Sequence, residues 1–272
     1  MNRNDGQIIV SIRHASFCYE NRSVFSEINF DIHAGEIFFL MGRNGCGKTT
    51  LIDSILGIHK LKKGQITVKD KSVYDYAPSD LGKEMAYVPQ AHNRFFSYKV
   101  WEIVLMGRTP YISGFGSPEE MDRQVVDNIL KEVGISHLAD RPYTQISGGE
   151  MQMVMLARAL AQQTPFIIMD EPTVYLDFYN ELLFLELVAG LAEYGKHTIL
   201  LAAHDPNQVF YLASRGIRVR VGLMRDGGMY RIGTPEAVLT EETIADVYGI
   251  QSRIVRGGPY QQIVPLHTNH VG

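Results

Sequence analysis

Apolar positions in the N-terminal third of the chain recur in short runs, several of which alternate with polar residues. Alternation with a period of two is typical of half-buried strands, and continuous short apolar runs are typical of fully buried ones. A segment with helical spacing, residues 48–56, follows the run that ends at Gly42 and stops at Gly57, a residue that commonly ends helices. The predicted strands cover residues 8–12, 24–32, 36–41, 64–68 and 84–88.

The pattern changes to mainly helical spacing from about residue 98 to residue 161. Residues 119–133 are the clearest example, because Pro118 precedes the amphipathic repeat and Gly134 follows it. Strands that alternate with helices indicate a mostly parallel sheet, and a helical block inserted into that sheet indicates a separate lobe. Later strands are predicted over residues 166–169, 198–202 and 217–224, with two strand-like pieces around residues 257–258.

The composition is that of an ordinary globular α/β protein. The 272 residues are 45% hydrophobic and 21% charged, which predicts a sizeable buried core. The net charge of -4 argues against a nucleic-acid-binding surface, since such domains are usually basic. The two cysteines, Cys18 and Cys46, are far apart in the sequence, which excludes a disulfide framework and favours a reducing compartment.

Neither a signal peptide nor a membrane span is expected. Residues 1–7 are polar, and the longest apolar runs, such as residues 37–41 and 198–203, are far shorter than the roughly 18 residues of a spanning helix. We therefore expect a soluble protein that reaches a membrane only through a partner.

Residues 42–49 match the phosphate-loop pattern G-x-x-x-x-G-K-[ST], between a predicted strand and a predicted helix. Glycines let backbone N–H groups approach phosphate oxygens, and a helix N-terminus adds a favourable partial charge. Lys48 is expected to reach the β- and γ-phosphates, and Thr49 is expected to hold Mg²⁺. The alternative is a glycine-rich turn with an unrelated lysine.

A second candidate site lies where the predicted strand over residues 166–169 ends in Asp170 and Glu171. Burying charge at a strand end is costly unless a metal ion or hydrogen bonds compensate for it. Asp170 therefore suits the binding of Mg²⁺, and Glu171 can polarise an attacking water. The alternative is that the carboxylates only cap the turn at Pro172.

Further motifs give the chain its resemblance to a known family. The run Ile146-Ser147-Gly148-Gly149-Glu150, just before a predicted helix, resembles the signature motif of ABC ATPases. Four other positions match family motifs in the family's order. Tyr19 matches the aromatic residue that stacks on adenine, and Gln90 matches the glutamine of the Q-loop. Asp177 matches the D-loop, and His204 matches the switch histidine.

The resemblance implies an α/β fold: a P-loop NTPase (RecA-like) core with a mostly parallel sheet, an antiparallel β subdomain and an inserted helical lobe. The implied ATP-binding domain covers residues 1–250, with the core and β subdomain in residues 1–90 and 165–250. The helical lobe would cover residues 91–164, and residues 251–272 would form a C-terminal extension.

The resemblance also implies an ATPase that works as a homodimer, with ATP and Mg²⁺ held between one subunit's phosphate loop and the other subunit's signature motif. Catalysis would rest on Lys48, Glu171 and His204, and Mg²⁺ would be held by Thr49, Gln90 and Asp170. ATP would be bound by Tyr19, Gly42, Asn44, Gly45, Cys46, Gly47, Lys48, Thr49, Thr50 and Gln90. Contacts with the partner subunit's ATP would come from Ser147, Gly148, Gly149, Glu150 and Asp177.

Three motifs depart from the family's pattern. Glu150 replaces the usual glutamine and adds a negative charge to the signature motif. Val174 and Tyr175 stand in the D-loop where small residues are common. Cys46 replaces a small residue of the phosphate loop, and we expect its alkylation to block ATP binding.

Residues 100–110 resemble the V-x-E-x-V-x-x-G-R-x-P stretch of ATPases that serve siderophore, haem and cobalamin importers. Residues 233–240 and 244–249 resemble the C-terminal part of that group, and Met106-Gly107-Arg108 after residues 95–97 resembles its molybdate and tungstate relatives. The resemblance thus favours uptake of a metal chelate or metal oxyanion. An exporter ATPase and, less favoured, a non-transport ABC ATPase are the alternatives.

The importer resemblance implies partners and a location. The partners would be an integral membrane permease and, indirectly, a periplasmic or lipoprotein solute-binding protein, with no nucleic acid. The chain would lie at the cytoplasmic face of the inner membrane, attached through the permease. Residues 94–98 and 111–115 carry aromatic side chains in predicted loops, and we expect them to line the groove for a permease helix.

Overall fold

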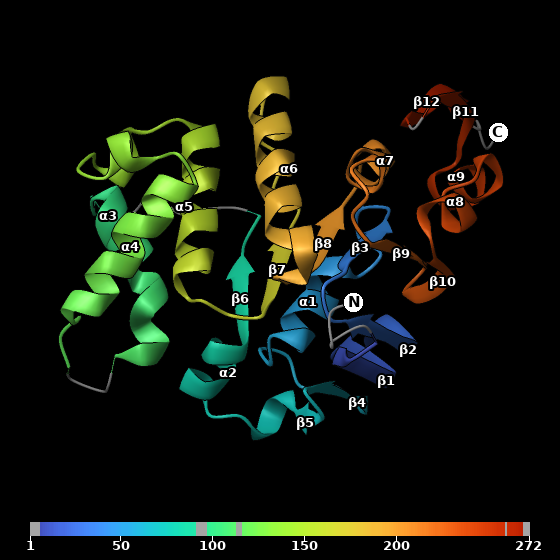
Figure 1. The fold of residues 1–272 in the computed structure, drawn as a ribbon. Coiled ribbons are helices and arrows are strands. Elements are labelled where there is room, and N and C mark those ends of the chain that lie inside the picture. Colours follow the sequence, from blue (N-terminus) through green and yellow to red (C-terminus); the bar gives the residue numbers. More distant parts are fainter. Residues whose placement is uncertain (1–5, 91–96, 113–115, 259, 269–272) are drawn as a thin grey trace. The chain divides into compact units, whose positions relative to one another are not determined.

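The computed structural model describes residues 6–90, 97–112, 116–258 and 260–268. The chain divides into two compact units (Figure 1). Unit 1 consists of Met1–Asp75 and Leu191–Gly272, and unit 2 consists of Tyr76–Gly190. Within the described ranges, no helix is long and apolar enough to cross a membrane.

The core of unit 1 contains four strands in the order β10-β9-β3-β8. β3 (Ile37–Gly42) pairs in parallel with both β8 (Thr198–Ala203) and β9 (Val219–Arg225), and β10 (Gly228–Gly233) pairs antiparallel to β9. Every residue of β3 and β8 is buried, which explains why both appear in the sequence as continuous apolar runs. The predicted strands at residues 36–41 and 198–202 are confirmed within one residue at each end.

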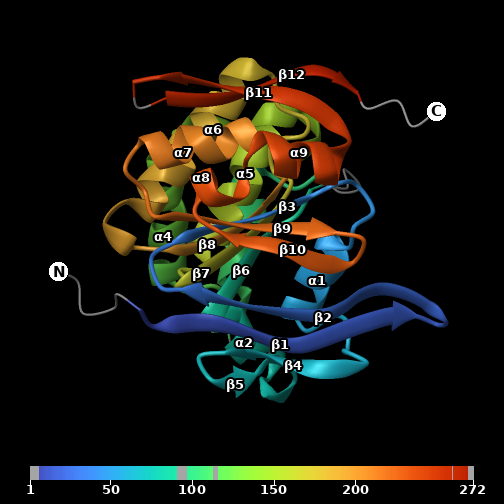
Figure 2. The ribbon, with the colours of Figure 1, turned by 90° about the vertical axis from the view of Figure 1, so that its right-hand side faces the viewer.

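A second sheet of unit 1 is antiparallel, with the order β2-β1-β4-β5, and Figure 2 shows β1, β2 and β4 side by side. Its bounds are β1 (Ile8–Tyr19), β2 (Arg22–His33), β4 (Lys63–Val68) and β5 (Lys71–Ser72). β1 is longer than the predicted residues 8–12, because register shifts after Ile12 interrupt the alternation of apolar and polar positions. The bulged strand continues to Tyr19, one of the predicted site residues.

Unit 1 is completed by short helices and a C-terminal hairpin, β11 (Ile250–Gly257) paired with β12 (Tyr260–Thr268). The hairpin lies against α7 and α9 (Figure 2), where the Asn207 amide accepts from the Ile263 N–H at 2.8 Å. The two strand-like pieces predicted around residues 257–258 are therefore confirmed. The helices are α1 (Lys48–Ile55), η1 (Val73–Asp75), η5 (Glu193–Gly195), α7 (Pro206–Ser214), α8 (Pro235–Val238) and α9 (Glu241–Tyr248).

Unit 2 combines two parallel strands, β6 (Met85–Val88) and β7 (Phe166–Asp170), with the predicted block of helices. A buried ion pair of 2.9 Å between Arg108 and Asp122 joins η2 to α4 inside this block. The block contains α3 (Val100–Leu105), η2 (Met106–Tyr111), α4 (Glu120–Glu132), η3 (Ser136–Leu138), η4 (Tyr143–Gln145) and α5 (Gly148–Ala161). It is flanked in the chain by α2 (Pro78–Glu84) and α6 (Phe178–Ala192). The predicted α/β class, with parallel strands, a separate antiparallel sheet and a helical block, is confirmed.

Candidate functional site

The phosphate loop connects the buried strand β3 to helix α1, as predicted. Gly42 has φ 147°, and a methyl group on it would lie 2.5 Å from the main-chain oxygen of Met224, so only glycine fits there. Gly47 is the N-cap of α1 with φ 106° and offers no side-chain cap. The first N–H groups of α1 are thus presented without a capping side chain, which is the arrangement that binds anions.

Lys48 occupies the first position of α1 and is buried. Its ammonium group donates to the Gly42 carbonyl oxygen at 2.9 Å, so the side chain folds back over the loop. Of the next two residues, Thr49 is exposed and Thr50 is half-buried. An ammonium group beside the N-terminus of a helix is suited to phosphate oxygens.

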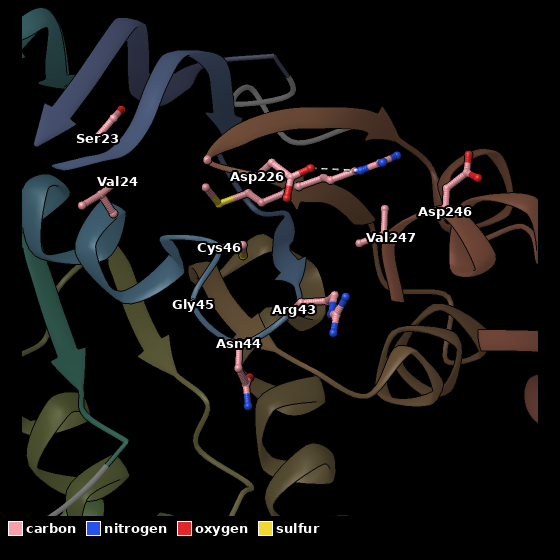
Figure 3. Close-up of a pocket in the computed structure, with 12 residues that line it drawn as sticks. Ser23, Val24, Arg43, Asn44, Gly45, Cys46, Asp226, Asp246 and Val247 are labelled. Atoms are coloured by element: carbon pink, nitrogen blue, oxygen red, sulfur yellow. Dashed lines mark hydrogen bonds and ion pairs between the residues drawn. The ribbon is translucent and has the colours of Figure 1, made fainter. Parts of the chain in front are cut away.

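A cavity of about 410 Å³ runs along the phosphate loop within unit 1 (Figure 3). Residues 43–46 form one wall, and Ser23 and Val24 of β2 lie beside them. The opposite wall comes from the β9–β10 turn at residues 224–227 and from Asp246 and Val247 of α9. These wall residues were not predicted, because no local pattern links them to a loop about two hundred positions earlier in the chain.

Two other predicted site residues also belong to unit 1. His204 directly follows β8, and the register pairs Met41 with Ala203, so the phosphate loop and His204 leave the sheet at the same edge. His204 is exposed, and the next residue, Asp205, caps α7 by accepting from the Asn207 N–H at 2.8 Å. Tyr19 ends β1, is 49% exposed, and has its hydroxyl 2.9 Å from Nε2 of His59.

The Q-loop glutamine and the acidic pair lie together in unit 2. β6 and β7 are parallel with Val88 opposite Met169, so the residues that follow them emerge at one sheet edge. Gln90 donates from Nε2 to Oε2 of Glu171 at 3.0 Å. Asp170 is buried at the end of β7, whereas Glu171 is half-buried and has φ 46°, an unusual backbone angle for a residue with a side chain. The hydrogen bond therefore joins the Q-loop glutamine to the acidic pair.

The signature motif forms the N-terminus of α5, as predicted. Ser147 is the N-cap, and it forms a reciprocal capping box with Glu150. The Glu150 carboxylate accepts from the Ser147 N–H at 2.7 Å and from the Ser147 hydroxyl at 2.8 Å. These bonds from Ser147 hold the pKa of Glu150 below its usual range, so the carboxylate is ionised at neutral pH.

The D-loop adjoins the signature motif within unit 2. A methyl group on Gly149 would lie 2.9 Å from the Asn180 side chain, and one on Gly148 would lie 3.9 Å from the Tyr175 carbonyl oxygen. Asp177 caps α6, since its Oδ1 accepts from the Asn180 N–H at 2.8 Å and from the Asn180 amide at 2.9 Å. This contact of Asn180 was not predicted, because no local pattern links it to the signature motif. Part of the predicted permease groove, residues 94–96 and 113–115, lies outside the described residues.

The chain is similar to known proteins over nearly its whole length. The family model described as ABC transporter matches residues 25–174. The molybdate import ATP-binding protein MolC of Haemophilus influenzae is 34% identical over 263 residues, which covers 95% of this chain and 96% of that protein. The iron(3+)-hydroxamate import ATP-binding protein FhuC of Bacillus subtilis is 34% identical over 237 residues, covering 87% and 86% of the two chains.

Solved structures agree with the sequence relatives. A chain from a metal-chelate type ABC transporter in an inward-facing conformation has a TM-score of 0.83 and 32% identity, covering 96% of this chain and 98% of that chain. The ATP-binding cassette MJ1267 of an ABC transporter, in its ADP conformation, has a TM-score of 0.78 at 23% identity and supports the fold. The predicted P-loop NTPase fold, family and ATPase activity are thus confirmed. The chain belongs to the ABC transporter family, as an ATP-binding subunit that hydrolyses ATP.

Proposed function

We propose that this chain powers the uptake of a metal chelate or metal oxyanion through a separate membrane permease, working as a homodimer at the cytoplasmic face of the inner membrane. The proposal is supported by the names of its relatives, which are import ATP-binding proteins for molybdate, iron(3+)-hydroxamate and hemin. A solute-binding protein outside the membrane would deliver the cargo to the permease. Transport would draw on ATP binding, which closes the dimer, and on hydrolysis, which opens it.

In this proposal each chain contributes two half-sites. The first half-site is the phosphate loop with Tyr19 and His204, and the observation that carries it is the Lys48 ammonium held 2.9 Å from the Gly42 oxygen, above an uncapped helix. The second half-site is the signature motif at residues 147–150 with the adjoining D-loop. ATP would lie between the first half-site of one subunit and the second half-site of its partner.

The donor set suits Mg²⁺, which prefers oxygen ligands and is usually held by one or two carboxylates together with substrate phosphates. Thr49 would offer a hydroxyl, Asp170 a carboxylate at a buried strand end, and Gln90 an amide oxygen. When bound, the ion would neutralise charge on the β- and γ-phosphates. Gln90 also donates to Glu171, so it would link the cation to the group that handles the water.

Glu171 would orient and polarise the attacking water, and Lys48 and His204 would stabilise the charge on the γ-phosphate in the transition state. Glu171→Gln is the variant that tests this role, since it keeps the shape of the side chain and removes the charge. We expect the variant to bind ATP with unchanged affinity, to form an ATP-dependent dimer by size-exclusion chromatography, and to hydrolyse ATP about 10² to 10⁴ times more slowly. Glu132→Gln, at an exposed position of α4, is the matched control.

Normal turnover by the Glu171→Gln variant would remove Glu171 from catalysis, and an ATP-bound monomer would contradict the dimer.

The cargo is tested in proteoliposomes that contain this chain, its permease and the binding protein. Ferric hydroxamate, hemin and molybdate are supplied separately, and stimulation of ATP hydrolysis by one of them identifies the class. With the ATPase subunits and ATP inside the vesicles, accumulation of enclosed cargo outside would identify an exporter.

A further inference from the structure

Tyr19 belongs to a small aromatic cluster in unit 1 that the proposed mechanism has not used. Its hydroxyl lies 2.9 Å from Nε2 of His59, a residue 40 positions away. The bond can form with either histidine tautomer, because a phenol hydroxyl both donates and accepts. The Tyr19 ring also meets the His59 ring edge to face, with centroids 5.5 Å apart at 89°.

His59 is itself held in place from two sides. Its ring stacks on Phe17, with centroids 5.0 Å apart at 22°, and Phe17 belongs to the buried core of the antiparallel sheet. Its Nε2 lies 3.6 Å from Oδ2 of Asp53 on α1. The Tyr19 ring also lies edge-on to Phe17 at 4.9 Å. Both the hydroxyl and one edge of Tyr19 are therefore fixed, while 49% of its surface is exposed.

The cluster also connects the two ends of helix α1. Lys48, at the start of α1, folds over the phosphate loop, and the turn after its last residue brings His59 back, with the His59 N–H donating to the Asp53 carbonyl at 3.3 Å. The helix has 8 residues and so spans about 12 Å. One rigid element thus carries the phosphate contacts at one end and the support of Tyr19 at the other.

We propose that His59 is a positioning residue for the nucleotide base, which holds the Tyr19 ring in the orientation that stacks on adenine. The inference rests on the proposed stacking of adenine on Tyr19. An exposed aromatic side chain loses rotamer freedom when a ligand binds, and a ring that is ordered beforehand avoids much of that loss. His59 therefore strengthens ATP binding through Tyr19, without touching the nucleotide.

The test compares ATP with inorganic tripolyphosphate, which has the phosphates but no base. His59→Leu removes the polar contact and keeps an apolar side chain, and Tyr19→Phe removes the hydroxyl and keeps the ring. We expect each variant to raise the Kd for ATP about 2- to 10-fold, the range of a single hydrogen bond. We expect the double variant to do no more than the stronger single one, because both changes break the same bond.

Two readouts separate positioning from a general structural role. Binding of tripolyphosphate should be equal in the wild type and both variants, and kcat at saturating ATP should be unchanged while KM rises. His267→Leu, at an exposed position of β12, is the control. The inference is overturned if His59→Leu weakens the binding of tripolyphosphate as much as the binding of ATP, or if it leaves the Kd for ATP unchanged.

Tyr19→Ala separates this inference from the function it rests on. If that variant binds ATP as tightly as the wild type, the stacking of adenine on Tyr19 is wrong and the role of His59 falls with it. If Tyr19→Ala weakens ATP binding but His59→Leu does not, the stacking stands and only the positioning role is overturned.

Discussion

The phosphate loop of unit 1 and the signature loop of unit 2 both lead into a helix N-terminus, where backbone N–H groups attract anions. The phosphate loop has Gly47 as its N-cap, with no side chain bonded across the helix start, and its cation is drawn over the loop. The signature loop has Ser147 as its N-cap, and the Glu150 carboxylate already accepts from both its N–H and its hydroxyl.

The helix start after the phosphate loop therefore has no side-chain cap, whereas the helix start in the signature loop is capped by Ser147 and Glu150. We infer that the first loop binds ATP in a single chain. The second loop would engage a partner's γ-phosphate only after Glu150 releases the Ser147 hydroxyl. Because Glu150 carries a negative charge where the family's glutamine carries none, it would repel a partner's phosphate and so oppose closure of the proposed dimer.

Alkylation of Cys46 should have the largest effect on this comparison. Cys46 lines the cavity along the phosphate loop, so a maleimide attached to its Sγ would occupy space beside the loop that the phosphates need. We expect N-ethylmaleimide to abolish ATP binding in the wild type and in Cys18→Ser, but not in Cys46→Ser. Mass spectrometry identifies the modified cysteine, and full ATPase activity of protein alkylated at Cys46 would contradict the prediction.

The second prediction separates the roles of the two loops. Lys48→Ala removes the cation of the phosphate loop, and we expect ATP hydrolysis to fall about 10²- to 10³-fold, with loss of ATP binding by the single chain. Ser147→Ala removes only the signature hydroxyl and the helix cap, so single-chain ATP binding should be unchanged while ATP-dependent dimerisation weakens. Calorimetric titration and size-exclusion chromatography measure the two effects. Equal loss of single-chain binding in both variants would remove the distinction between the loops.

The glycines of the two loops should differ in the cost of an added methyl group. Gly42→Ala would place a methyl group 2.5 Å from the Met224 main-chain oxygen at φ 147°, and we expect the free energy of unfolding to fall by about 1–3 kcal/mol or more. Gly149→Ala meets the Asn180 side chain, which can move at the cost of its bond to Asp177, about 0.5–1.5 kcal/mol. Urea unfolding measures the loss of unfolding free energy in each variant. A larger loss for Gly149→Ala than for Gly42→Ala would contradict the prediction.

Glu150→Gln should give the smallest effect. It removes a negative charge from the first turn of α5, and we expect a loss of about 0.3–1 kcal/mol of stability together with tighter ATP-dependent dimerisation. Bonds from Ser147 lower the folded-state pKa of Glu150, so its stabilisation is present above the unfolded-state pKa and is lost as pH falls through the folded-state value. The variant should lack this acid-side loss when thermal unfolding is followed as the pH falls below the usual carboxyl range. If the stability of the variant fell more steeply with decreasing pH than that of the wild type, the assigned direction of the Glu150 contribution would be wrong.

Local pattern was enough to predict the elements that carry the site. The apolar run at residues 36–41 became β3, the run at residues 166–169 became β7, and the motifs lie in the loops that follow these strands. The side-chain period and the glycine positions depend on residues close together in the chain, so the sequence alone determined the phosphate loop, the signature helix and the family.

Tertiary structure decided what faces these loops. The contact of Tyr19 with His59, the cavity wall at Asp226 and Asp246, and the contact of Asn180 with Gly149 join segments with no shared periodicity. The length of β1 was also missed, because bulges shift its alternation. Sequence pattern reports which side of an element is apolar, whereas the partner of each side chain depends on how β1, α1 and α9 pack within unit 1, and packing brings together residues that are distant in the chain.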